Sequence, residues 1–154
     1  MSKNPKRPSS AEPKRRRREP VADTKGGCTL RVVGVGASAG GLSAVQRLVA
    51  TIPATAPLAI VYVQHADPHS ENLLVPLLAA KTGLVVVAAS AGVRIATGHV
   101  YVAPPHTDVS LADGRVCLTP RASRSGPPRT IDAWFQSLAA DRRQDAIGVV
   151  LSGT

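Results

Sequence analysis

The chain has 154 residues, a length that suits one domain. Hydrophobic residues make up 44% of it but aromatic residues only 3%, so the core must be built from valine, leucine, isoleucine and alanine. The formal net charge is +9, and no apolar run reaches the roughly 18 residues of a transmembrane helix, which argues against an integral membrane protein.

Residues 1–28 are rich in proline, serine and basic residues and show no apolar period. This composition predicts a disordered basic tail, followed by a folded domain over residues 29–154. The basic run at 14–18 could contact nucleic acid or an anionic membrane surface, or it could simply be solvated. Because no secretory signal and no aromatic stacking platform are visible, we expect a cytoplasmic protein with no specific nucleic-acid partner.

The first part of the predicted domain alternates strands with helices. Residues 29–35 form a β-branched run bounded by glycines, and residues 58–63 and 84–88 are further continuous apolar runs, so all three predict strands. Apolar residues recur at helical spacing over residues 42–52, before Pro53. Strands that are apolar throughout are typical of a parallel sheet covered on both faces.

A second helix is predicted over residues 70–81, between the second and third strands. Pro76 falls inside it and should either kink the helix or move its start to a later residue. The side expected to be buried carries Leu73, Leu74, Leu77 and Leu78.

The following segments are shorter. Residues 99–103, 109–111 and 116–119 are short apolar runs, and Asp113-Gly114 between the last two is a hairpin signal. We therefore expect this part to be antiparallel. After an irregular loop at 120–130, the pattern predicts a helix from Thr130 and a buried strand over residues 146–151. The predicted fold is three-layer α/β and Rossmann-like, with a mostly parallel, doubly wound sheet and an antiparallel hairpin near one edge.

The turn after the first strand offers the main candidate site. The sequence Gly36-Ala-Ser38-Ala-Gly40 fits the Gly-x-Ser-x-Gly elbow, with a strand before it and a helix after it. Ser38 could be a nucleophile if a base removes its proton, and His65, after the second strand, lies at the same carboxyl edge of the predicted sheet. The backbone N–H of Ala39, at the start of the helix, could then stabilise an oxyanion.

Other interpretations of the same residues remain open. Gly34-x-Gly36-x-x-Ala39 also fits a dinucleotide fingerprint, which needs an acidic residue at the end of the second strand, where Gln64-His65 stands instead. The glycine-rich turn could also be purely structural. A metal site is not expected, because no carboxylate or cysteine completes a set of metal ligands with the histidines. The two cysteines are also far apart in the chain. Asp132, in the first turn of a helix, is explained by the helix dipole.

Five ordered motifs carry a resemblance to a known family. They are VVGVGASAGG, VYVQHADP, GHVYVAPPHTDVSL, RTIDAWFQSLA and AIGVVLSGT, and together they span roughly residues 30–154. The chain resembles the catalytic domain of the CheB-like chemotaxis protein-glutamate methylesterases, most closely the version fused to a receptor methyltransferase.

This resemblance implies a serine esterase that hydrolyses glutamate γ-methyl esters on the cytoplasmic helices of chemoreceptors, and in some members deamidates glutamine. Ser38 would be the nucleophile, His65 the general base and Ala39 an oxyanion-hole donor, with Thr154 bordering the site. No cofactor is implied. A receptor methyltransferase, fused or separate, is an implied partner.

Two departures from the family pattern matter. Residues 1–28 are too short for the N-terminal receiver domain of regulated members. The family's triad aspartate would follow Thr154 by three positions, so we expect a C-terminally truncated domain that is poorly soluble and nearly inactive. Loss of that carboxylate from a Ser-His-Asp triad costs roughly 10⁴-fold in kcat.

Overall fold

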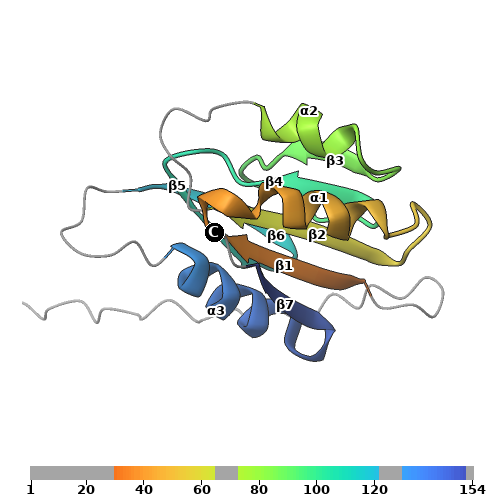
Figure 1. The fold of residues 1–154 in the computed structure, drawn as a ribbon. Coiled ribbons are helices and arrows are strands. Elements are labelled where there is room, and N and C mark those ends of the chain that lie inside the picture. The colour runs from red at the N-terminus through yellow and green to blue at the C-terminus, as the bar shows by residue number, and fades with distance from the viewer. Residues whose placement is uncertain (1–29, 65–72, 122–129, 152–154) are drawn as a thin grey trace, which may run out of the picture.

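The structure is a computed structural model that describes residues 30–64, 73–121 and 130–151 (Figure 1). Its main sheet has five parallel strands in the order β3-β4-β2-β1-β7. The strands are β1 (Arg31–Ala37), β2 (Leu58–Gln64), β3 (Val85–Ala88), β4 (His99–Val102) and β7 (Ala146–Leu151). The predicted basic tail lies outside the described residues.

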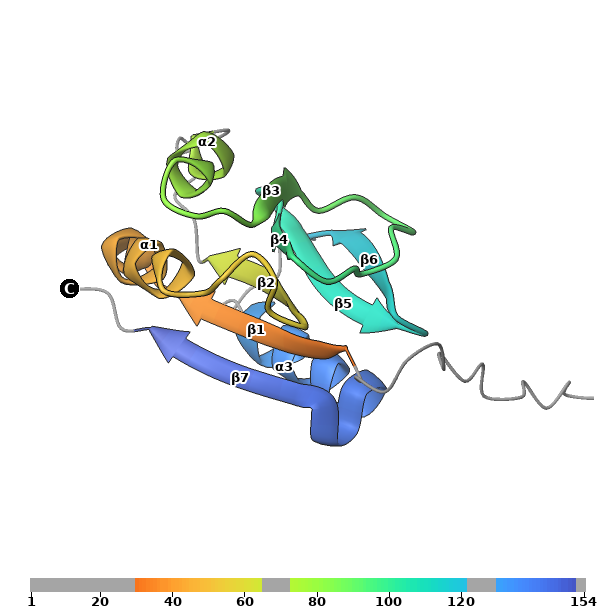
Figure 2. The ribbon, with the colours of Figure 1, turned by 90° about the vertical axis from the view of Figure 1, so that its right-hand side faces the viewer.

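The helices lie on both faces of this sheet, and this arrangement confirms the predicted three-layer α/β fold (Figure 2). On one face, Val45 of α1 and Leu78 of α2 belong to one buried cluster. On the other face, Trp134 of α3 packs with Val109 of a separate hairpin. The helices are α1 (Leu42–Ala50), α2 (Leu74–Ala79) and α3 (Thr130–Arg142).

The hairpin consists of β5 (Thr107–Ala112) and β6 (Arg115–Pro120), paired antiparallel as predicted. Its two turn residues have positive φ, 51° at Asp113 and 72° at Gly114, the conformation that favours an Asp-Gly sequence. The prediction was wrong for residues 99–102, because β4 pairs in parallel with β2 and β3 in the main sheet. The hairpin signal at Asp113-Gly114 applies only to the two strands that it joins, and β4 is instead held between β2 and β3.

The second helix is shorter than predicted. It begins at Leu74, so Pro76 lies in its first turn, where a missing backbone N–H breaks no helical hydrogen bond. Leu78 is fully buried as expected, but Leu73 and Leu77 are exposed, which corrects the predicted buried side. No helix in the described parts of the chain is long and apolar enough to span a bilayer.

Strand β7 also differs from its prediction as a buried strand. It ends the strand order, so on its outer side it pairs with no described strand. Ile147 is 41% exposed and Val150 74% exposed. An apolar strand sequence therefore occupies a sheet edge in the described structure.

Candidate active site

Three neighbouring strands end at the same level of the sheet. Ala37, the last residue of β1, is in register with Gln64 at the end of β2 and with Leu151 at the end of β7. Ser38 is the next residue after Ala37, and His65 is the next after Gln64. The carboxyl edge of an open α/β sheet is where ligands bind, so the register identifies the candidate site at the edge that the sequence predicts.

Ser38 forms the turn between β1 and a short 3-10 helix, Ala39–Gly41, that leads into α1. Its backbone is extended, with φ −82° and ψ 176°, and its carbonyl accepts the Gly41 N–H at 2.9 Å. The residue is exposed. The first N–H groups of a helix have no acceptor within it, and the N–H of Ala39, the first residue of this 3-10 helix, is one of them.

Gly34 and Gly36, the two glycines before Ser38, have a packing role against α3. A Cβ on Gly34 would lie 2.6 Å from Leu138 Cδ2 and 2.7 Å from Trp134 Nε1, and one on Gly36 would lie 2.5 Å from Ile131 Cγ2. All three contacts come from α3, on the face of the sheet opposite α1. These two glycines therefore let α3 pack closely under β1.

Gly41 serves the turn itself. A Cβ at this position would lie 2.6 Å from the Cβ of Ala37, so only a small residue allows α1 to start this close to the end of β1.

A buried tyrosine orients a polar side chain at the end of β2. The Tyr62 hydroxyl donates a hydrogen bond to Gln64 Oε1 at 2.7 Å. Burial raises the pKa of Tyr62 to about 12, so its phenol stays a donor at neutral pH. Gln64 stands where a dinucleotide site would have an acid, and the period of two in β2 indicates that Tyr62 and Gln64 share a face of the sheet.

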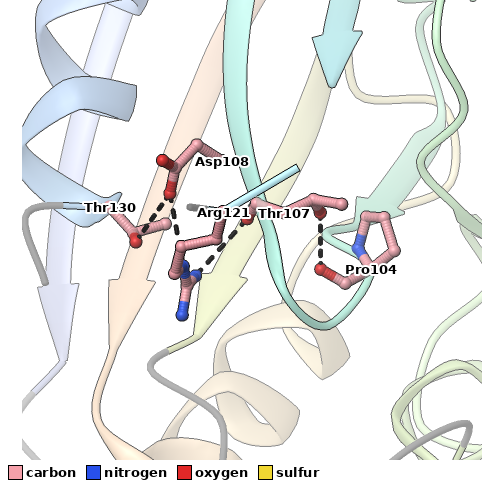
Figure 3. A network of polar contacts seen from close by, with 5 residues as sticks. All are labelled: Pro104, Thr107, Asp108, Arg121 and Thr130. Atoms are coloured by element: carbon pink, nitrogen blue, oxygen red, sulfur yellow. Dashed lines mark hydrogen bonds and ion pairs between the residues drawn. The ribbon is translucent and has the colours of Figure 1, made fainter. Parts of the chain in front are cut away.

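A polar network fixes the start of α3 (Figure 3). Asp108 Oδ1 accepts a hydrogen bond from Thr130 Oγ1 at 2.9 Å and lies 3.4 Å from Arg121 Nε. Arg121 also donates to the Thr107 carbonyl, and the Thr107 hydroxyl donates to the Pro104 carbonyl at 2.7 Å. Thr130 is only 3% exposed, so its hydroxyl depends on this bond. The sequence identified Thr130 as a helix start but did not reveal its partner.

The remaining predicted site residues fall in different parts of the chain. His65 and Thr154 lie outside the described residues, so their roles in the site stay predictions. Asp132 lies exposed in the first turn of α3, as the helix-dipole argument expects. Within the described ranges, no group of three or more His, Cys, Asp or Glu residues could hold a metal ion.

Comparisons with known proteins agree with the motifs. The sequence profile of the CheB methylesterase family matches residues 33–154. The protein-glutamate methylesterase/protein-glutamine glutaminase of Photorhabdus laumondii is 33% identical over 129 residues, which are 80% of this chain and 36% of the relative. Protein-glutamate methylesterase/protein-glutamine glutaminase 4 of Anaeromyxobacter dehalogenans is 34% identical over 131 residues, with 81% and 36% covered. The chain thus spans about a third of the length of these curated relatives.

A solved structure shows the same fold. The crystal structure of the Thermotoga maritima CheB methylesterase catalytic domain superposes with a TM-score of 0.70 at 26% sequence identity, covering 82% of this chain and 69% of that one. The family profile covers most of the chain and the fold agrees with that of a solved member. The chain therefore belongs to the CheB methylesterase family.

Proposed function

We propose that this chain is a protein-glutamate methylesterase whose nucleophile is Ser38 and whose general base is His65. The observation that carries the proposal is the register of Ala37 with Gln64, because the two residues immediately precede Ser38 and His65. Neighbouring strands lie about 4.8 Å apart, so the side chains of the two residues that follow a paired position can approach each other. Membership of the CheB methylesterase family supports the same chemistry.

The proposed reaction is acyl transfer through the serine. The Ser38 Oγ attacks the γ-carbonyl carbon of a methylated glutamate, and His65 accepts the hydroxyl proton. The Ala39 N–H stabilises the oxyanion, and His65 then returns the proton to the departing methoxide, which leaves as methanol. Water activated by His65 cleaves the acyl-serine ester and regenerates Ser38, leaving glutamate. The site needs no cofactor for these steps.

The substrate and setting are also proposals. The relatives are named protein-glutamate methylesterase/protein-glutamine glutaminase, so we infer that a glutamine carboxamide can react at the same serine, with ammonia leaving. The proposed partners are the methylated cytoplasmic helices of chemoreceptors and a receptor methyltransferase, fused or separate, in the cytoplasm. Thr154 is proposed to border the site, because it lies three residues after Leu151, which is in register with Ala37. The division into a basic tail (1–28) and a methylesterase domain (29–154) stays a prediction.

A fluorophosphonate probe tests the proposal, since it reacts preferentially with activated serines and leaves ordinary serine hydroxyls unmodified. We expect one adduct on the full chain, located at Ser38 by mass spectrometry, and none on Ser38→Ala. Ser90→Ala is the matched control, because Ser90 is an exposed serine just after β3 in the same sheet, and it should label like the wild type. If a folded chain that continues past Thr154 to the expected triad aspartate stays unlabelled, the result would instead support a noncatalytic or nucleotide-binding module that uses the same glycine-rich turn.

A further inference from the structure

Charge is divided unevenly between the two faces of the molecule. The described residues from 30 to 107 contain no aspartate or glutamate, and their charged residues other than histidine are all basic: Arg31, Arg47, Lys81 and Arg94. Every described carboxylate side chain follows in the chain, from β5 onward: Asp108, Asp113, Asp132, Asp141 and Asp145. The layer made by α1 and α2 is therefore basic among the described residues, and its field favours an acidic partner.

A concavity lies in this basic layer. Its volume is about 380 Å³, and it is lined by Ser43, Gln46, Arg47, Ala50 and Lys81. The Gln46 side chain donates to the Leu77 carbonyl at 3.3 Å, which joins α1 to α2 at this point. We call this concavity the α1–α2 groove.

The two cations of the α1–α2 groove are available for binding. Arg47 and Lys81 are both exposed, and neither forms an ion pair with a described residue. The side chains that line the groove include no acid, so nothing in the lining neutralises them.

The lining of the α1–α2 groove begins near the start of the helix that follows the candidate nucleophile. Ser43 is the second residue of α1 and lies five residues after Ser38, whereas Ala50 is the last residue of α1. The helix α1 itself runs from the carboxyl edge of the sheet toward its other end (Figure 1), and four of the five residues that line the groove lie along it. A nine-residue helix such as α1 is about 13 Å long, which matches about two and a half turns of a helical ligand.

We propose that the α1–α2 groove binds an acidic helical segment of the substrate protein, next to the glutamate that reacts at Ser38. This inference rests on the proposed function for the site, and it adds a docking surface and its chemistry. Carboxylates on one face of the ligand helix would pair with Arg47 and Lys81, while Ser43 and Gln46 offer hydrogen-bonding groups. Such exposed pairs contribute selection and orientation more than affinity.

The test measures binding of a fluorescein-labelled helical peptide of glutamate and alanine that carries no ester, by anisotropy at low salt. The full chain is used in a Ser38→Ala background, so hydrolysis plays no part. Arg47→Glu and Lys81→Glu should each weaken binding about threefold to tenfold, because each replaces an attraction with a repulsion. The glutamine version of the peptide should bind weakly and respond to neither substitution.

The matched control is Arg31→Glu, which makes the same charge change at an exposed residue at the start of β1, the opposite end of the strand from Ser38. It should weaken binding less than twofold. Equal losses for Arg31→Glu and Arg47→Glu, or no loss for either groove variant, would overturn the proposal, since binding would then depend on net charge or on residues 1–28. Fluorophosphonate labelling reports the esterase separately: groove-dependent binding without labelling would refute only the proposed function, and labelling without groove-dependent binding would refute only the groove.

Discussion

At the scale of single residues, the elbow around Ser38 combines two packing requirements in one short sequence. Gly34 and Gly36 face α3, whereas Gly41 faces the end of β1. Neither Gly34 nor Gly36 has a positive φ, so backbone freedom does not explain them. Glycine is therefore required at positions 34 and 36 because α3, about a hundred residues later in the chain, packs against them.

Substitution of Gly34 tests this packing. Gly34→Ala should lower the free energy of unfolding by about 1–3 kcal/mol, because the added methyl meets the buried, rigid ring of Trp134. Gly148→Ala is the control: Gly148 is paired with Gly34 in the sheet, yet its Cβ would lie 3.5 Å from Phe135, an ordinary contact. The control should be neutral or slightly stabilising in chemical denaturation. Equal effects of the two substitutions would contradict the packing argument.

Tyr62 gives a prediction for alkaline pH. Its pKa is about 12 in the folded protein and 10.0 as a free phenol, so the unfolded chain loses the proton first. The stabilisation is complete below pH 10 and should be lost between about pH 10 and 12, at roughly 1.4 kcal/mol per pH unit at most. Tyr62→Phe has no phenol to titrate, so the stability difference between wild type and variant should shrink over that window. Urea denaturation at several pH values measures it, and a difference that stays constant would show that Tyr62 titrates normally.

At the scale of secondary structure elements, Asp108 joins three of them. It lies on β5, bonds the first residue of α3 and approaches Arg121 just after β6. One residue after Thr130, Ile131 contacts the position that a Cβ on Gly36 would occupy. The network therefore sets where α3 begins and so how it packs under the strand that leads to Ser38.

Removal of this carboxylate should loosen the start of α3. Asp108→Ala leaves the buried Thr130 hydroxyl without its acceptor, which should lower the free energy of unfolding by about 1–3 kcal/mol. Asp132→Ala also removes a carboxylate near the same helix start, but Asp132 is exposed and contributes only through the helix dipole, about 0.3–1 kcal/mol. Thermal unfolding of both variants measures the loss of stability that each substitution causes. A loss from Asp132→Ala as large as that from Asp108→Ala would mean that charge alone matters.

At the scale of the whole molecule, the two faces of the sheet differ in chemistry. The face with α1 and α2 carries cations along the proposed groove, and the described acids lie in the segments from β5 onward. The β7 edge adds exposed apolar side chains, with Val150 the most exposed of them. Such an edge is a place where strands of other chains can pair.

Much of this architecture follows from local sequence alone. Apolar runs predicted the strands, Asp113-Gly114 predicted the hairpin turn, and the position of Ser38 between a strand and a helix predicted its turn. These features depend on neighbouring residues, whose backbone preferences and apolar periods are visible in the sequence. The ordered motifs also identified the family.

Other features were decided only by the tertiary structure. The parallel pairing of β4, the edge position of β7, the bond from Asp108 to Thr130 and the contact of α3 with Gly34 all join segments that are distant in the chain. The register that brings the ends of β1, β2 and β7 to one level belongs to this group as well. Local preferences cannot encode such contacts, because each depends on the space that the remaining layers leave once the sheet has assembled.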